Sequence, residues 1–236
     1  MGKEDLAEAQ KLFDQAVELD RAFPDPYVFR ALTGIVGVFS GYATSPSEVL
    51  KEADGFAQRA LQLDQGNALA HTIFGRLLTF AGKHEAAIAE NRLSIELNPN
   101  LALAHYGLGA ALLWSGHADR SIPHLEQALR LSPRDPLSPV WRNAMSMALT
   151  FMGDDAGALV ARDEALRQLH NVMFAALRPV SLVGLGRFDE ARASVAESLA
   201  QNPRLSLRFI AQSMPGLYSV YLTLLLDRLR EAGLPE

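Results

Sequence analysis

The stretch ALAHYGLGAALLWSGHADRSIPHLEQALRLSP, residues 102–133, decides the fold because it repeats the stretch that precedes it. Residues 68–99 read ALAHTIFGRLLTFAGKHEAAIAENRLSIELNP. Four landmarks recur after the same 34 residues: Gly75 as Gly109, Gly82 as Gly116, Ala87 as Ser121 and Pro99 as Pro133. A fixed period of this length is typical of arrays in which each repeat is one small unit that stacks on the next.

Each copy predicts two helices joined by a tight turn. In the best copy the first helix covers residues 102–114, and the second, residues 119–131, has the 3.6-residue apolar spacing of an amphipathic helix. A glycine separates the two helices in four copies, at positions 82, 116, 153 and 186. Glycine adopts the left-handed backbone conformation that lets the second helix fold back antiparallel to the first. Gly75 and Gly109, in mid-helix, predict close approach of the two backbones.

The fifth copy departs from this pattern. It places Pro179 where other first helices carry a small residue. A proline inside a helix removes one backbone hydrogen bond and clashes with the preceding turn. We therefore predict a kink near Arg178–Pro179.

Less regular segments flank these repeats. Residues 1–22 predict a second-type helix, that is, one with the pattern of the second helix of a pair, but without a first helix before it. Residues 23–67 form a longer repeat with an insertion around 41–47. Ser45-Pro46-Ser47-Glu48 resembles a capping box and predicts a helix over 48–63. Residues 206–236 predict two helices, the last over 217–231, that cover the open end. We expect one all-α domain, a right-handed superhelical solenoid of antiparallel helix pairs, with the segments 1–22, 23–67, 68–101, 102–138, 139–171, 172–205 and 206–236.

This pattern resembles the tetratricopeptide repeat. The best copy matches its usual landmarks at Leu108-Gly109, Gly116, Ala128 and Pro133, and the copy before it at Gly75, Gly82, Ala87 and Pro99. The usual tryptophan of the first helix is replaced by His71, His105 and Arg142. The resemblance implies a helix-pair solenoid that binds other proteins.

A narrower resemblance covers nearly the whole chain. The insertion-bearing first repeat, residues 131–137 (LSPRDPL) and residues 229–236 (LREAGLPE) are similar to the C-terminal tetratricopeptide module of bacterial class III adenylate cyclases and related signalling regulators. The resemblance implies a regulatory or scaffolding part of a bacterial signalling protein. Any catalytic domain of such a protein would lie outside these residues.

Composition narrows the class of protein. Of the 236 residues 49% are apolar and 21% are charged, which indicates an extensive core. The net charge of −5 favours neither nucleic-acid binding nor docking to a membrane surface. The apolar runs 32–39 and 220–226 are too short to cross a bilayer. The absence of cysteine excludes disulfides and suits a reducing compartment, so we expect a cytoplasmic chain.

Catalytic signatures are missing from the sequence. It contains no His-Glu-x-x-His, no Gly-x-Ser-x-Gly and no phosphate-binding Gly-Lys-Ser/Thr loop. Asp154-Asp155 is explained by the preference of acidic residues for a helix N-terminus. We expect no enzymatic activity, no cofactor and no metal site.

His71, His105 and Arg142 occupy equivalent positions in successive first helices. One interpretation is a ladder that binds an anion or small ligand. The other is a set of polar side chains packed between helices in place of tryptophan. No carboxylate shares the position to complete a metal site, which favours packing.

The concave groove of tetratricopeptide arrays is lined by the first helices. By transfer of the groove positions, the candidate partner-binding residues are Arg76, Phe80, Tyr106, Leu113, Trp114, Asn143, Met147 and Phe151. This apolar, aromatic set predicts a partner helix or extended peptide as ligand, with packing between repeats as the alternative. The Lys and Asn pattern that clamps acidic chaperone tails is absent. The apolar stripe of the last helix predicts core packing, with a homodimer or docking to a further domain as the alternatives.

Overall fold

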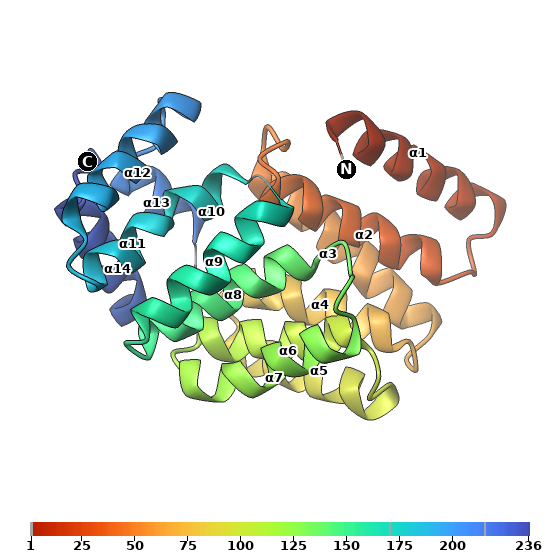
Figure 1. Cartoon of the computed structure of the whole chain (residues 1–236). Helices are drawn as coiled ribbons and strands as arrows, with labels where there is room; N and C mark the ends of the chain where they lie inside the picture. The colour runs from red at the N-terminus through yellow and green to blue at the C-terminus, as the bar shows by residue number, and fades with distance from the viewer. Residues whose placement is uncertain (1, 170, 215) are drawn as a thin grey trace.

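The computed structural model describes residues 2–169, 171–214 and 216–236, and every regular element in these ranges is a helix. Figure 1 shows the helices following one another along the chain. The first helices of the pairs are α2 (Asp25–Phe39), α4 (Ala68–Phe80), α6 (Ala102–Trp114), α8 (Ser138–Phe151) and, in two pieces, α10 (Val172–Ala176) and α11 (Arg178–Gly184). The second helices are α3 (Pro46–Leu63), α5 (His84–Leu97), α7 (Ala118–Leu131), α9 (Asp155–Gln168) and α12 (Phe188–Gln201). Helix α1 (Lys3–Leu19) precedes the first pair, and α13 (Leu207–Ser213) and α14 (Ser219–Glu231) follow the last.

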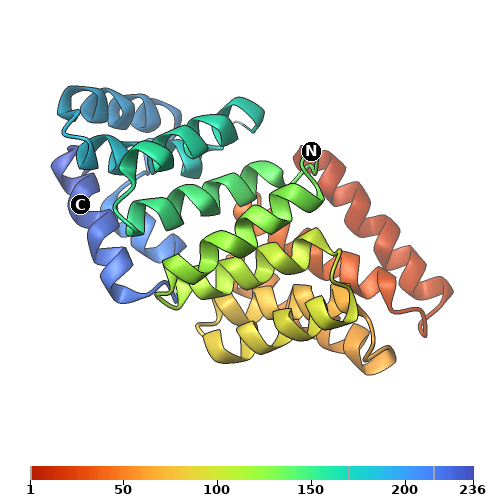
Figure 2. The same cartoon turned by 60° about the horizontal axis from the view of Figure 1, so that its bottom comes forward.

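The helix pairs form two layers. The first helices α2, α4, α6 and α8 contact one another in chain order, whereas α3, α5 and α7 mainly contact the first helices on either side of them. Because the first helices lie closer together than the second helices, the array curves toward the first-helix layer. Figure 2 shows the successive pairs stacked along this path. The structure confirms the predicted all-α solenoid.

Stacking joins the repeats into one core. The main cluster of buried apolar side chains runs from Tyr27 in α2 to Leu234 near the C-terminus. A single helix pair is too small to bury its apolar face alone, so its stability depends on its neighbours.

Glycines at the turns adopt the predicted conformation. Gly82, Gly116, Gly153 and Gly186 all have positive φ, between 71° and 93°. Gly41 has the same conformation at the end of α2 and marks a fifth such turn. The extra residues of the first repeat follow it, in a longer connection to α3 and in a longer α3.

Close approach within each pair also follows the prediction. A Cβ atom on Gly109 would lie 2.9 Å from the side chain of Leu125 and 3.3 Å from the carbonyl oxygen of Ser121. A Cβ atom on Gly75 would lie 3.2 Å from the carbonyl oxygen of Ala87. Side chains larger than hydrogen at these positions would therefore separate the two helices of the pair.

Two local predictions have different outcomes. The predicted kink is confirmed, because the first helix of the fifth copy is interrupted at Leu177 between α10 and α11. The predicted capping box is wrong: Ser45 precedes α3, but its side chain forms no capping hydrogen bond. Its ψ of 79° departs from the extended conformation in which an N-cap hydroxyl reaches the first amides, and α3 begins at Pro46.

The C-terminal strap, residues 216–231, crosses back over earlier repeats. The Tyr218 amide donates to the Trp114 carbonyl at 2.8 Å, and the Tyr221 hydroxyl donates to the Gly116 carbonyl at 2.9 Å. The Tyr221 ring stacks on Phe151 with 3.9 Å between ring centres. Gly216 packs against Gly82, where a Cβ atom on Gly216 would lie 3.1 Å from the Gly82 Cα. The strap thus satisfies carbonyl groups left free at the C-terminus of α6.

Two turn glycines test the contact between strap and repeats. Both Gly116→Ala and Gly153→Ala place a side chain in the left-handed region, which costs about 1–2 kcal/mol of unfolding free energy. At Gly116 the new methyl group also meets the Tyr218 ring, 2.8 Å away, whereas nothing lies within 4 Å at Gly153. We expect Gly116→Ala to be the more destabilising change in urea unfolding. The additional loss of unfolding free energy at Gly116 should disappear when Tyr218 is also replaced by alanine. Equal losses of unfolding free energy for Gly116→Ala and Gly153→Ala would contradict the contact between the strap and the repeats.

Candidate functional site

The candidate site is the first-helix face, the surface formed by α2, α4, α6, α8, α10 and α11. All eight candidate partner-binding residues lie on three of these helices. Arg76, Tyr106, Leu113 and Met147 are buried, and Phe80, Trp114, Asn143 and Phe151 are partly buried. The structure therefore brings together side chains from three successive repeats, and packs them more closely than an open groove requires.

A stack of three side chains crosses this face. The guanidinium carbon of Arg76 lies 5.0 Å from the centre of the Tyr106 ring. Tyr106 stacks in turn on Trp141, with 5.9 Å between ring centres. Trp141 is fully buried, and its indole N–H has no hydrogen-bond partner among the described residues. Trp141 was not among the site residues predicted from the sequence, although it is one of only two tryptophans in the chain.

A row of aromatic rings follows the C-terminal ends of the first helices. Phe80 contacts Phe39 at 5.0 Å and Trp114 at 5.7 Å between ring centres. Phe151 instead contacts Tyr221 of the strap. These aromatic side chains thus pack against one another between repeats, and part of each stays accessible to solvent.

Most cationic side chains of the first helices face a carboxylate on a second-type helix. The pairs are Arg30 with Asp14 at 2.9 Å, His71 with Glu90 at 2.6 Å, Arg142 with Glu164 at 3.4 Å and Arg178 with Asp163 at 2.8 Å. These pairs link the two layers of the solenoid and give each of these basic side chains a carboxylate partner.

Arg76 is different. This residue is only 6% exposed, and its side chain forms no hydrogen bond or ion pair with any described residue. Its side-chain nitrogens have no hydrogen-bond partner, but none of them is fully buried. Each nitrogen therefore retains contact with solvent. Arg76 is therefore a cation at the first-helix face that is nearly enclosed but unpaired.

Separate partners hold the three side chains of the alternative ladder interpretation, His71, His105 and Arg142. His71 is held by Glu90 and by the Gln65 carbonyl, and Arg142 by Glu164. His105 contacts the Pro99 carbonyl through Nε2 at 3.0 Å. The structure thus gives each side chain its own neighbour in the same or the preceding repeat and shows no contact among the three.

Arg162 on α9 is a buried polar residue that sequence analysis missed. It is 1% exposed, and its Nη1 donates to Asn143 Oδ1 at 2.6 Å. Its Nε has no partner among the described residues. Burial lowers the pKa of Arg162 to about 9, although nearby Asp163 favours the charged form. The sequence feature that could have identified Arg162 is a polar residue on the inward side of a second helix. Asn91, at the equivalent position of the second repeat, is also buried.

A histidine pair in the third repeat replaces a histidine–carboxylate pair in the second. His105 and His124 lie 34 residues after His71 and Glu90. Their rings stack with 6.1 Å between centres. Burial lowers the pKa of His124, and the positive charges of His105, Arg92 and Arg120 lower it further.

This pair predicts a pH-dependent stability. Because the pKa of His124 lies below its ordinary value of 6.5, the unfolded chain takes up protons before the folded chain as pH falls. The contribution of this site to the unfolding free energy is therefore greatest above about pH 6.5 and decreases as pH falls through the folded-state pKa. His124→Glu places a carboxylate opposite His105, as in the second repeat. At pH 5.5 relative to pH 7.5, this variant should recover up to about 1 kcal/mol of unfolding free energy.

Urea unfolding at the two pH values measures this change. His124→Gln is the matched control, because it removes the titrating group without adding a charge. The His124→Gln variant should show a weaker pH dependence of the unfolding free energy than the wild type, without a reversal of its direction. If both variants keep the wild-type pH profile, His124 does not govern it.

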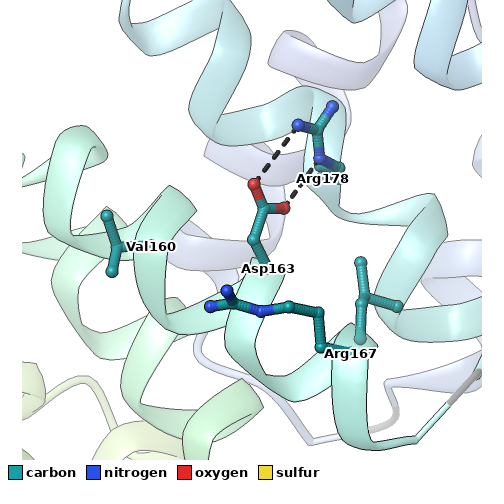
Figure 3. Close-up of a pocket in the computed structure, with 5 residues that line it drawn as sticks. Val160, Asp163, Arg167 and Arg178 are labelled. Atoms are coloured by element: carbon teal, nitrogen blue, oxygen red, sulfur yellow. Dashed lines mark hydrogen bonds and ion pairs between the residues drawn. The ribbon is translucent and has the colours of Figure 1, made fainter.

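A surface hollow lies where α9 meets α11. Figure 3 shows it with Val160, Asp163, Arg167 and Arg178. Arg178 donates through Nε and Nη2 to the two carboxylate oxygens of Asp163, at 2.8 and 3.3 Å. The central charges of this hollow are thus paired with each other, and we assign it no ligand.

Metal-binding clusters and membrane-spanning helices are both missing from the described residues. Within residues 2–169, 171–214 and 216–236, no three His, Asp or Glu side chains are placed to hold a metal ion. None of the helices in these ranges has the length and apolar character that spanning a bilayer demands.

Comparison with known proteins identifies the fold. No protein-family model and no curated protein sequence matches the chain. Among solved structures, a chain of the APC/C hetero-tetramer Cut9–Hcn1 has 17% identity and a TM-score of 0.72; the match covers 96% of this chain and 40% of that chain. A thermophilic tetratricopeptide protein of Thermus thermophilus has 18% identity and a TM-score of 0.59, covering 72% of this chain and 92% of that one.

A third structure is that of YrrB, described as a tetratricopeptide protein with an unusual peptide-binding site. It has 19% identity and a TM-score of 0.51, covering 81% of this chain and 93% of YrrB. These identities are too low to transfer a function, but the shared arrangement of helix pairs extends over most of the chain. The chain therefore has the tetratricopeptide-repeat fold.

Proposed function

We propose that this chain is a non-catalytic module that binds a protein partner, as a peptide or helix, at the first-helix face. The observation that carries the proposal is that the partly exposed rings of Phe80 and Trp114 pack together on the helices that also carry Arg76 and Tyr106. Aromatic and arginine side chains are enriched at the residues that contribute most to protein–protein binding. The fold supports the same role, and YrrB, which shares it, has a peptide-binding site.

The wider setting belongs to the same proposal. The sequence resemblance to the repeat module of bacterial class III adenylate cyclases favours a regulatory part of a cytoplasmic signalling protein. The known chemistry of such a cyclase has no counterpart among the motifs of this sequence, so the module would act by binding. A homodimer through α14 stays a prediction: Leu225 and Leu229 are buried within the chain, whereas Val220 is 59% exposed.

Selection from a random peptide library displayed on phage tests the proposal with the purified full chain. The blocking variant is Ala110→Arg, because Ala110 lies on α6 at the position equivalent to Arg76 and is partly exposed. Val160→Arg is the matched control, since Val160 is 60% exposed on the second helix α9. Both variants add the same side chain.

We expect enriched peptides to lose at least about tenfold in affinity, or 1.4 kcal/mol, for Ala110→Arg and to keep their affinity for Val160→Arg. Fluorescence polarisation with labelled synthetic peptides gives the dissociation constants, and circular dichroism establishes that both variants are folded. Peptides that bind both variants equally, or a selection that enriches none, would contradict binding at the first-helix face.

A further inference from the structure

The two layers of the solenoid carry different charges. The first helices α2, α4, α6, α8, α10 and α11 contain one carboxylate, Asp25 in the first turn of α2. The same helices contain six basic side chains, namely Arg30, His71, Arg76, His105, Arg142 and Arg178. The carboxylates that face them are supplied by the second-type helices. The first helices thus supply the basic groups, and the second-type helices supply the carboxylates that pair with four of them.

Within this set, Arg76 alone combines near-complete burial with a charge that no described carboxylate neutralises. The four pairs above give a carboxylate partner to Arg30, His71, Arg142 and Arg178. Arg76 is 6% exposed and keeps its nitrogens in contact with solvent. Enclosing a guanidinium without a charge partner is unfavourable, so an anion that reaches it gains a strong electrostatic interaction.

The Tyr106 ring borders the place where such an anion would bind. Tyr106 lies against the guanidinium, 5.0 Å from the Arg76 carbon to the ring centre. The guanidinium N–H groups that do not point at the ring remain free to donate hydrogen bonds. These in-plane donors match the two oxygens of a carboxylate, which accept a pair of parallel hydrogen bonds.

The amount of free charge favours a carboxylate over a phosphate group. The next basic side chain along α4 is His71, and it is already held by Glu90. A single unpaired guanidinium matches the single charge of a carboxylate, whereas a phosphate dianion needs further cations or donors.

We propose that Arg76 binds a carboxylate of the peptide partner, an Asp or Glu side chain or a free C-terminus, beside the Tyr106 ring. This inference rests on the proposed function, because it names the chemistry of the ligand at the first-helix face. The ligand class is a peptide that combines apolar anchors with one acidic group placed to reach Arg76.

A direct test needs no identified partner. Sodium acetate is titrated into the ¹⁵N-labelled full chain, and the Nε–H resonance of Arg76 is followed at constant ionic strength. We expect a saturable shift of this resonance that is absent from the Nε–H of Arg142, whose guanidinium is paired with Glu164. A resonance of Arg76 that does not move, or that moves linearly like those of exposed arginines, would overturn the proposal.

Peptide affinities give the second test. Peptides that depend on the first-helix face are resynthesised with Asp and Glu changed to Asn and Gln and with an amidated C-terminus. The protein variants are Arg76→Gln, Arg76→Lys and the matched control Arg142→Gln. We expect at least about tenfold weaker binding for Arg76→Gln, a smaller recovery with Arg76→Lys, and little change for Arg142→Gln.

The two proposals fail in different ways. Peptides that bind the first-helix face equally well to wild type and Arg76→Gln, or equally well without their carboxylates, overturn the Arg76 proposal and leave the proposed function intact. If the library yields no peptide for this face, the proposed function fails, and the acetate titration alone decides whether Arg76 is a carboxylate site.

Discussion

The close approach of the two helices in each repeat is the constraint on which the structure depends. At Gly75 and Gly109 the backbone of a first helix lies against the carbonyl groups of its partner helix, with no room for a side chain. This contact fixes the angle within the pair, and the left-handed glycine at the turn allows the pair to close. Similar pairs then stack with a regular offset. The layer of first helices, and every side chain on it, follows from that offset.

Much of this could be predicted from the sequence because the information is local and repeated. The 34-residue period, the turn glycines and the small mid-helix residues predict the helix pairs, and Pro179 predicts the break between α10 and α11. The capping box at Ser45 failed because a motif of residue types does not determine the backbone conformation at its first position.

What the sequence could not show depends on contacts between distant residues. Tyr221 donates a hydrogen bond to a carbonyl 105 residues earlier, and no periodic pattern encodes this contact. The pairing of basic and acidic side chains across the two layers is similarly invisible until the register of each pair is known. Arg142 shares its repeat position with His71, whereas Arg76 lies at another position of the first helix, and among the described residues only Arg142 of these two arginines meets a carboxylate.

The strap changes how this solenoid behaves as a whole. In a simple linear array each unit is coupled only to its immediate neighbours, so the ends can fray independently. Here Arg228 of α14 bonds Asp155 at the start of α9, while Gly216 lies on the turn of the second repeat. Local unfolding at the C-terminal end must therefore remove contacts made by repeats far from that end. We expect the chain to melt as one cooperative body rather than unit by unit.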